Sequence, residues 1–365
     1  MCQPGTATCV LVDHVQISTA TTGLRVLQTA VTGLSLTPEP DPATPGNTLA
    51  ECYQLWQGTA WGNVVTADVE IAGEKAASVP IQIIATPNAT PNAQTCPSNG
   101  FIRGDLPAGV QLLGANGVIG LGTLVQDCKQ GACGSQYFSC NPNNGNCQVN
   151  VAAAPPVSEQ VTNPVTMFAS DKDGVIITLP SVDPAAGAPS GLAGTLTFGI
   201  GTQPNNAYNS AATALPAGPL VGAVTTTYTS QTAGSAPVQY TSLFDTGAVS
   251  YHFTDGGIAM CAVKGLATFY CPAAPLSLNA TVAGSGGVGS AKVAFTVANA
   301  ETLNSANPNS IAFSTLGSTP PANWGPGTFI WGLPFFFGRT VYIAYPSASV
   351  TGSGGAQLKG PFYAF

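Results

Sequence analysis

Charged side chains are scarce in this chain. Of its 365 residues, only 9 are Lys or Arg and 16 are Asp or Glu, which gives a formal net charge of −7. The basic residues are scattered and form no patch that could neutralise a run of phosphates, so we expect no nucleic-acid partner. The acidic charge is dilute, which argues against electrostatic steering of a charged partner.

Patterns for metal sites and membrane spans are also missing. The chain has two histidines, His14 and His252, and no Cys-x-x-Cys pair, so it offers no zinc-type ligand set and we expect no metal and no cofactor. No stretch approaches the ~20 apolar residues of a membrane span. The best candidate, residues 330–338, is short and interrupted by Gly332 and Pro334. No apolar leader follows Met1, so this chain shows no signal peptide.

The abundance of hydrophobic residues, glycine and proline favours an all-β protein. The chain is 44% hydrophobic and contains 43 Gly and 30 Pro, and short Val, Ile, Leu and Phe runs alternate with turn residues. Its length exceeds the roughly 250–300 residues at which one core usually splits, so we expect two lobes. The Pro/Gly/Ala stretch 180–193 is the best linker, which predicts lobes at 1–188 and 189–365.

Ten cysteines point to disulfides and to an extracytoplasmic, oxidising compartment. Four pairs are close enough in sequence to close short loops: Cys2 with Cys9, Cys128 with Cys133, Cys140 with Cys147, and Cys261 with Cys271, leaving Cys52 and Cys96. Each closed loop would contribute about 2–4 kcal/mol. The segment 127–149 is rich in Cys, Asn and Gly and is predicted to be a disulfide-stapled insertion. Sequence alone does not fix the pairing.

The most informative motif is Asp245-Thr246-Gly247, which follows the hydrophobic run at Leu243-Phe244. A strand that enters an Asp-Thr-Gly turn is how an aspartic protease presents one of its two catalytic carboxylates. That mechanism needs two carboxylates that share one proton. A matching turn occurs near the start of the chain, but it reads Ser18-Thr19-Ala20.

Each half of the chain also contains a later hydrophobic segment that ends in glycine. Val118-Ile119-Gly120 follows the first turn, and Ile330-Trp331-Gly332 follows the second. The ordered recurrence of turn and segment indicates a duplicated unit.

With these motifs the chain resembles the pepsin-like aspartic proteases. The resemblance implies two double-ψ β-barrel lobes with few short helices and an interlobe cleft, in which each turn and its later strand form a ψ-shaped loop. Residues 53–62 are similar to the flap hairpin that covers substrate in that family, which makes Trp56, Gln57 and Trp61 expected ligand contacts. The two tryptophans fit equally well as residues that pack the hairpin onto its lobe.

The chain resembles more closely a bacterial secreted family of unknown function. The segments that carry this likeness are Asp13-His14-Val15, Gly114-Ala115-Asn116-Gly117, residues 198–203 and residues 331–339.

The departures from the protease pattern affect chemistry more than scaffold. Ser18 replaces the first carboxylate, and Ala248 replaces a hydroxyl that bonds the second carboxylate in the family. Gln57 or Trp56 stands where the family carries a flap tyrosine. Thr19 and Thr246, which brace the two lobes in the family, are retained.

Other roles for these residues have weaker support. Asp245 is either a surviving acid–base group or a carboxylate held by turn amides. Ser18 as a nucleophile would need a base. His14 lies four residues back, about 13 Å along a strand, and no Gly-x-Ser-x-Gly elbow is present. His252, seven residues beyond Asp245, is predicted to be too distant as well.

The sequence therefore predicts a secreted, periplasmic or surface homologue of the aspartic proteases with an incomplete dyad at Asp245 and Ser18. We expect a monomer that binds an extended peptide or protein segment by strand-like hydrogen bonds. Contacts are expected from Thr19, Thr246, Gly247 and the flap residues. An active aspartic peptidase that pairs Asp245 with another group, and a purely structural envelope protein, are the alternatives.

Overall fold

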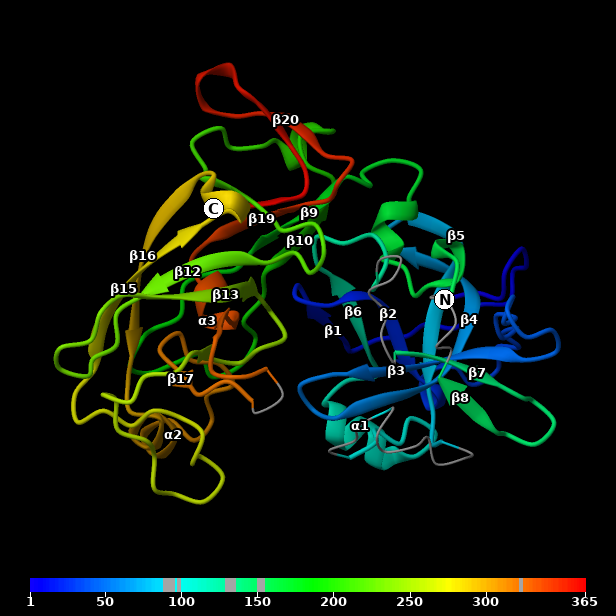
Figure 1. Ribbon diagram of the computed structural model, residues 1–365, viewed down its shortest axis with the longest axis horizontal. Helices are drawn as coiled ribbons and strands as arrows, with labels where there is room; N and C mark the ends of the chain where they lie inside the picture. The colour runs from blue at the N-terminus through cyan, green and yellow to red at the C-terminus, as the bar shows by residue number, and fades with distance from the viewer. Residues whose placement is uncertain (88–95, 97–99, 129–135, 150–154, 322–323) are drawn as a thin grey trace. The chain divides into compact units, whose positions relative to one another are not determined.

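The computed structural model describes residues 1–365 except 88–95, 97–99, 129–135, 150–154 and 322–323. The chain folds mainly into β-strands and divides into two compact units, Met1–Lys172 and Asp173–Phe365 (Figure 1). The prediction of an all-β protein with two lobes and few short helices is confirmed.

Unit 1 is built on an eight-stranded sheet with the order β1-β6-β2-β5-β4-β3-β7-β8. Its strands are β1 (Val15–Ser18), β2 (Thr22–Leu27), β3 (Thr48–Gln54), β4 (Thr59–Ile71), β5 (Glu74–Ile84), β6 (Gly117–Leu121), β7 (Tyr137–Cys140) and β8 (Cys147–Val149). The helix α1 (Pro107–Leu113) begins with a proline, whose fixed φ suits the first turn, and ends at Gly114 in the left-handed conformation.

Unit 2 contains a seven-stranded sheet, β16-β15-β12-β13-β18-β14-β17, a five-stranded sheet, β10-β9-β19-β22-β11, and the pair β20-β21. The strands of the larger sheet are β12 (Val224–Tyr228), β13 (Val238–Phe244), β14 (Tyr251–His252), β15 (Leu276–Ala283), β16 (Ser290–Val297), β17 (Gly317–Ser318) and β18 (Thr328–Trp331). The remaining strands are β9 (Gly174–Thr178), β10 (Thr195–Phe198), β11 (Ala214–Pro216), β19 (Thr340–Ala344), β20 (Ser349–Thr351), β21 (Gln357–Lys359) and β22 (Phe362–Ala364). Two short helices, α2 (Ala300–Ala306) and α3 (Leu333–Phe336), belong to this unit.

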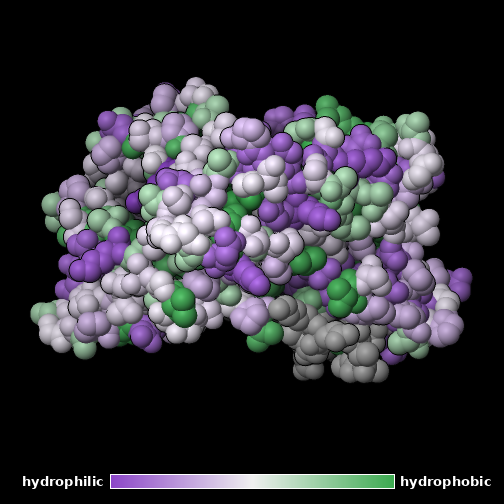
Figure 2. All heavy atoms as spheres, turned by 90° about the horizontal axis from the view of Figure 1, so that it is seen from above, coloured by the Kyte–Doolittle hydropathy of each residue, from purple (hydrophilic) through white to green (hydrophobic). Residues whose placement is uncertain are grey.

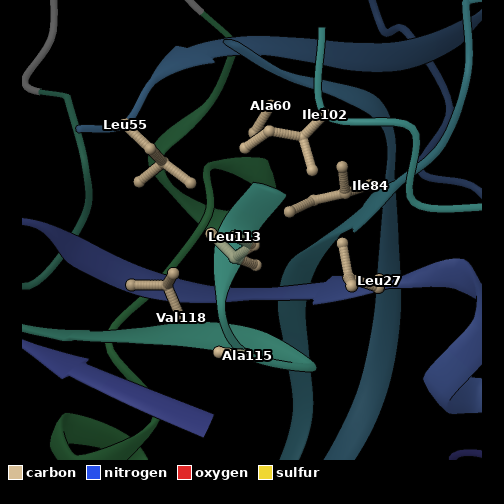
Figure 3. Packing of buried hydrophobic residues seen from close by; sticks show 8 residues of the cluster. All are labelled: Leu27, Leu55, Ala60, Ile84, Ile102, Leu113, Ala115 and Val118. Carbon is tan, nitrogen blue, oxygen red and sulfur yellow. The ribbon is translucent and has the colours of Figure 1, made fainter. Parts of the chain in front are cut away.

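Each unit has its own apolar core. In unit 1 the side chains of one cluster converge from the sheet, from α1 and from the segments between them (Figure 3), and they are Leu27, Leu55, Ala60, Ile84, Ile102, Leu113, Ala115 and Val118. In unit 2 the core is aromatic. The rings of Phe253 and Phe329 stack 5.1 Å apart, and Trp331 lies 4.6 Å from Phe329. The indole N–H of Trp331 donates to Thr226 Oγ1, so its one polar atom is satisfied.

The two compact units divide between Lys172 and Asp173, 16 residues before the boundary at 188/189 that the sequence suggests. Strand β9 lies before the proposed linker, yet it pairs with both β10 and β19 of the second unit. Residues 183–188 are also bonded within unit 2, where Ala188 N–H donates to Ala312 O. A Pro/Gly-rich composition marked a loop here, but the hydrogen bonds of the preceding strand decide its unit.

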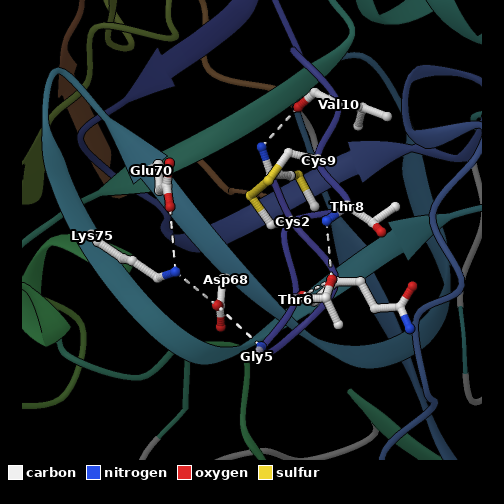
Figure 4. Close-up of a disulfide and its surroundings, with 11 residues drawn as sticks. Cys2, Gly5, Thr6, Thr8, Cys9, Val10, Asp68, Glu70 and Lys75 are labelled. Atoms are coloured by element: carbon white, nitrogen blue, oxygen red, sulfur yellow. Dashed lines mark hydrogen bonds and ion pairs between the residues drawn. A yellow bond between two sulfur atoms is a disulfide. The ribbon is translucent and has the colours of Figure 1, made fainter.

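Disulfides are confirmed in the part of the chain that the structure describes. Cys2–Cys9, Cys52–Cys96, Cys140–Cys147 and Cys261–Cys271 are bonded, and Figure 4 shows the first of these bridges beside Asp68 and Lys75. Cys128 is disulfide-bonded too. Cys133, its predicted partner, lies outside the described residues.

The bridges are expected to stabilise the chain according to the loop each closes. Cys52–Cys96 spans 44 residues, whereas Cys2–Cys9 spans 7. Loop-closure entropy predicts about 4 kcal/mol for the longer loop and about 2.5 kcal/mol for the shorter one. Chemical denaturation of C52S/C96S and C2S/C9S would measure this order. Equal losses would show that unfolded-chain entropy does not control the effect.

The surface matches the low charge of the sequence. On the face drawn in Figure 2, residues of intermediate hydropathy predominate, with polar and apolar groups interspersed. Among the described residues, no helix is long and apolar enough to span a bilayer.

Candidate functional site

The Asp245 turn is formed by three strands of unit 2. Strand β13 runs parallel to β18 and ends at Phe244, which pairs with Trp331. The backbone N–H of Asp245 donates to Trp331 O at 2.9 Å, and the backbone N–H of Gly247 donates to Asp245 Oδ1 at 2.8 Å. Strand β14 then returns on the other side of β18, antiparallel to it. Asp245 is fully buried, so its carboxylate is oriented by the turn.

The Ser18 turn in unit 1 has the same backbone plan. Strand β1 runs parallel to β6 and places Ser18 opposite Gly120. Strand β2 returns on the other side of β6 and is antiparallel to it. Ser18 and Thr19 are both buried.

The duplicated sequence pattern therefore corresponds to a duplicated ψ-shaped arrangement. Because Phe244 pairs with Trp331, the next residues, Asp245 and Gly332, correspond to Ser18 and Gly120. The glycines permit close backbone contact: a Cβ on Gly120 would lie 2.4 Å from Thr22 N, and one on Gly332 would lie 2.0 Å from Ser250 O. This crossing explains why each hydrophobic segment must end in glycine.

The structure offers Ser18 no base from His14. The His14 side chain is 82% exposed and its Nδ1 lies 3.2 Å from Asp13 Oδ2. The residue has a positive φ of 49°, which breaks the straight strand assumed from the sequence.

The predicted flap hairpin is present as β3 and β4, which pair antiparallel from Gln54 with Thr59 to Ala50 with Asn63. At its tip, Gln57 Nε2 donates to Gln16 Oε1 at 3.2 Å. Gln16 lies in β1, two residues before Ser18. The tip of the hairpin is therefore bonded to the strand that leads to the Ser18 turn.

The two hairpin tryptophans differ in environment. Trp56 at the tip is half-buried, whereas Trp61 in β4 is 5% exposed. The Trp61 ring meets Phe138 edge-on at 4.9 Å and belongs to a core cluster with Cys52 and Cys96. Trp61 is thus placed mainly as a core residue, because its ring packs against Phe138 of β7, which lies on the other side of β3 in the same sheet. A small cavity of about 230 Å³ meets its remaining surface.

A buried polar group beside the Asp245 turn was missed from the sequence. Ser318 Oγ lies 2.7 Å from His252 Nδ1, and Ser250 Oγ lies 3.3 Å from His252 Nε2 and 2.9 Å from Ser318 Oγ. Burial lowers the pKa of His252, although a hydrogen bond to Thr319 and the charge of Asp245 oppose that shift. The imidazole is therefore neutral at neutral pH.

The charge of Asp245 acts to raise the pKa of His252, so the two groups interact electrostatically, although the sequence predicts a distant pair. The chain reverses between the two residues, so they flank the same strand, β18, and seven residues do not span an extended path. The sequence did contain a signal for this position, because the same offset occurs in both units. Arg25 lies seven residues after Ser18 and pairs with Val118, and His252 lies seven residues after Asp245 and pairs with Ile330.

Unit 2 also contains an apolar cavity of about 550 Å³ beside α2. Asn299, in its lining, accepts from Thr302 N–H and donates to Pro272 O, and Thr315 Oγ1 donates to Pro184 O. These polar atoms are occupied within the protein, so the cavity presents apolar surface. None of its lining residues belongs to the Asp245 turn.

The one grouping of metal-ligand residue types found among the described residues is Cys261, Cys271 and Glu301. The two cysteines are bonded to each other. The Glu301 carboxylate accepts from the N–H groups of Ala262 and Val263. These atoms already have partners, and we assign no metal to them.

Comparison with known proteins identifies the family. The model of a family described as a protein of unknown function, DUF3443, matches residues 1–365. The chain belongs to the DUF3443 family. Curated proteins yield no match.

Among solved structures, an aspartic proteinase from Irpex lacteus is similar at 14% sequence identity and a TM-score of 0.48. The match covers 96% of this chain and 88% of that one. The duplicated ψ arrangement described above, rather than this distant match, carries the comparison of fold.

Proposed function

We propose that this DUF3443 protein is a non-catalytic, extracytoplasmic homologue of the aspartic proteases that binds an extended peptide or protein segment. The observation that carries the proposal is Ser18, which has the same register to Gly120 as Asp245 has to Gly332. Acid proteolysis requires two carboxylates that share a proton. A serine hydroxyl does not titrate in the useful range and supplies no second carboxylate.

The retained scaffold supports binding. The turn residues Thr19, Thr246 and Gly247 remain, and the β3–β4 hairpin carries Trp56 and Gln57 at its tip. Extended peptides bind such frameworks through main-chain hydrogen bonds, with side-chain pockets adding specificity. The scarcity of charge favours an uncharged peptide segment over an acidic or basic one.

The disulfides support the extracytoplasmic location, since such bonds persist in oxidising compartments. The same cross-links suit a protein that keeps its fold without a bound cofactor.

Acid peptidase assays and titration with a statine-containing peptide would test this function. We expect no turnover at acidic pH and measurable binding of the statine peptide. Binding should weaken in Q57A, which loses the hairpin-tip amide, and should persist in Q54A, a matched change in β3. Turnover that D245N abolishes would identify a working peptidase instead, and absence of peptide binding in a folded protein would refute the binding role.

A further inference from the structure

A buried cluster in unit 1 joins one cation to two carboxylates. Arg25 in β2 donates from Nε to Glu51 Oε2 at 3.1 Å and from Nη2 to Glu51 Oε1 at 2.5 Å. The same Nη2 donates to Asp127 Oδ2 at 2.7 Å. The side chains of Arg25, Glu51 and Asp127 are 1%, 0% and 0% exposed. Both carboxylates are therefore removed from water, and both rely on the same guanidinium group for charge compensation.

A second donor fixes the relative position of the carboxylates. Gln136 Nε2 donates to Glu51 Oε1 and to Asp127 Oδ2, each at 2.8 Å. These are the two oxygens that also accept from Arg25 Nη2. Two oxygens that share the same pair of donors are held close to one another, and neighbouring ionised carboxylates repel unless a proton lies between them.

Tyr137 completes the cluster. Its hydroxyl donates to Asp127 Oδ1 at 2.8 Å and accepts from Val161 N–H at 2.7 Å. Burial, with the nearby charges of Asp127 and Glu51, raises the pKa of Tyr137 well above its usual value. The phenol thus stays protonated and neutral.

The cluster contains more acidic groups than basic ones. The titratable groups that face each other are Arg25 of β2, Glu51 and Tyr53 of β3, Asp127, and Tyr137 of β7. The Tyr53 ring lies 3.5 Å from the guanidinium carbon of Arg25 and adds no charge. One cation and two ionised carboxylates would leave a net negative charge in a dry interior, where uncompensated charge is costly.

We propose that Asp127 keeps a proton that lies between its carboxyl group and that of Glu51, and that this pair, clamped by Arg25, is a latch that is tightest at acidic pH and holds Asp127 and β7 to β2 and β3. The elements it joins are β2, β3, the start of the insertion at Asp127, and Gln136-Tyr137 at β7. Loss of the proton leaves the two carboxylates to repel each other across Arg25, which loosens Asp127 and β7 from β3.

The direction of the pH effect follows from burial. Burial first, and then the charge of Glu51 and its hydrogen bond, raise the pKa of Asp127 well above its usual value. The folded state therefore binds a proton that the unfolded chain releases above about pH 4. The contribution to stability is fully present below that pH and is lost as pH rises through the raised pKa.

The first test compares variants across pH from about 4 to about 8. D127N and E51Q each remove the need for the shared proton. The melting temperature of each variant minus that of the wild type is expected to rise as pH increases. D68N is the matched control: Asp68 is also buried, but hydrogen bonds from Ser78 N–H and from Lys75 keep its pKa below the usual value despite the opposing effect of burial. Because the pKa of Asp68 is lowered, its contribution to stability is complete above the usual pKa of Asp, so the D68N difference should stay nearly constant from about pH 5 to about pH 8.

The second test uses the wild-type protein and does not depend on a variant's folding. Infrared spectroscopy at neutral pH should show the C=O stretch of a protonated carboxyl, and amide exchange at Tyr137 to Cys140, corrected for intrinsic pH dependence, should quicken as that band is lost. A pH-independent difference for D127N and E51Q, or the absence of the carboxyl band at neutral pH in the folded protein, would overturn the latch.

Discussion

Replacing Ser18 by Asp and Ala20 by Gly is expected to give this protein acid peptidase activity. The double change restores the Asp-Thr-Gly turn at the position whose register matches Asp245. A second carboxylate supplies the partner that shares a proton and activates water. General acid–base groups contribute about 10²–10⁴-fold each, so the gain over the wild type should fall in or above that range. Turnover of peptide substrates at acidic pH would measure it.

Two controls separate chemistry from packing. S18N/A20G has nearly the same shape as the active design but cannot ionise, and it should remain inactive. Adding D245N to S18D/A20G should abolish the new activity, because the dyad is again reduced to one carboxylate. A folded S18D/A20G variant without activity would show that loss of the dyad is not what separates this protein from the peptidases. Ala248 would then be the next position to change, since the pepsin-like proteases that the sequence resembles carry a hydroxyl there.

The sequence predicted the features that depend on local pattern. Alternating apolar residues indicated strands, and the recurrence of a turn and a Gly-terminated segment indicated two ψ-shaped loops. These are readable because the close crossings at Gly120 and Gly332 exclude a side chain. Short-range cysteine pairs were also readable, since a sequence separation of 7 brings Cys2 and Cys9 close together.

Features that depend on long-range contacts were not readable. Arg25 was one of nine scattered basic residues, and its carboxylate partners lie 26 and 102 residues away. Local sequence periodicity does not predict a cluster whose members are so far apart in the chain. The buried position of His252 was missed because the chain reverses within the turn. Trp61 could not be assigned to core or ligand surface without knowing that Phe138 of β7 packs against its ring.

Removing the charge of Arg25 is expected to be the most damaging substitution in unit 1. R25M keeps an apolar stem of similar length but leaves Glu51 and Asp127 buried with no cation. Breaking a buried ion pair by removing one partner costs about 3–5 kcal/mol, because the remaining charge is uncompensated. Urea denaturation at neutral pH would measure this loss, and the loss should shrink at acidic pH, where protonation neutralises the carboxyls.

The matched control is K75M. Lys75 also bonds two carboxylates, Asp68 at 3.0 Å and Glu70 at 3.3 Å, but its side chain is 48% exposed. Exposed pairs contribute about 0–1 kcal/mol, so K75M should be far milder than R25M. Combining R25M with E51Q and D127N removes every charge from the cluster, and stability should partly return. If the triple variant were as unstable as R25M, the cost would arise from lost packing and hydrogen bonds around the guanidinium, and the two carboxylates would not be the source of the strain.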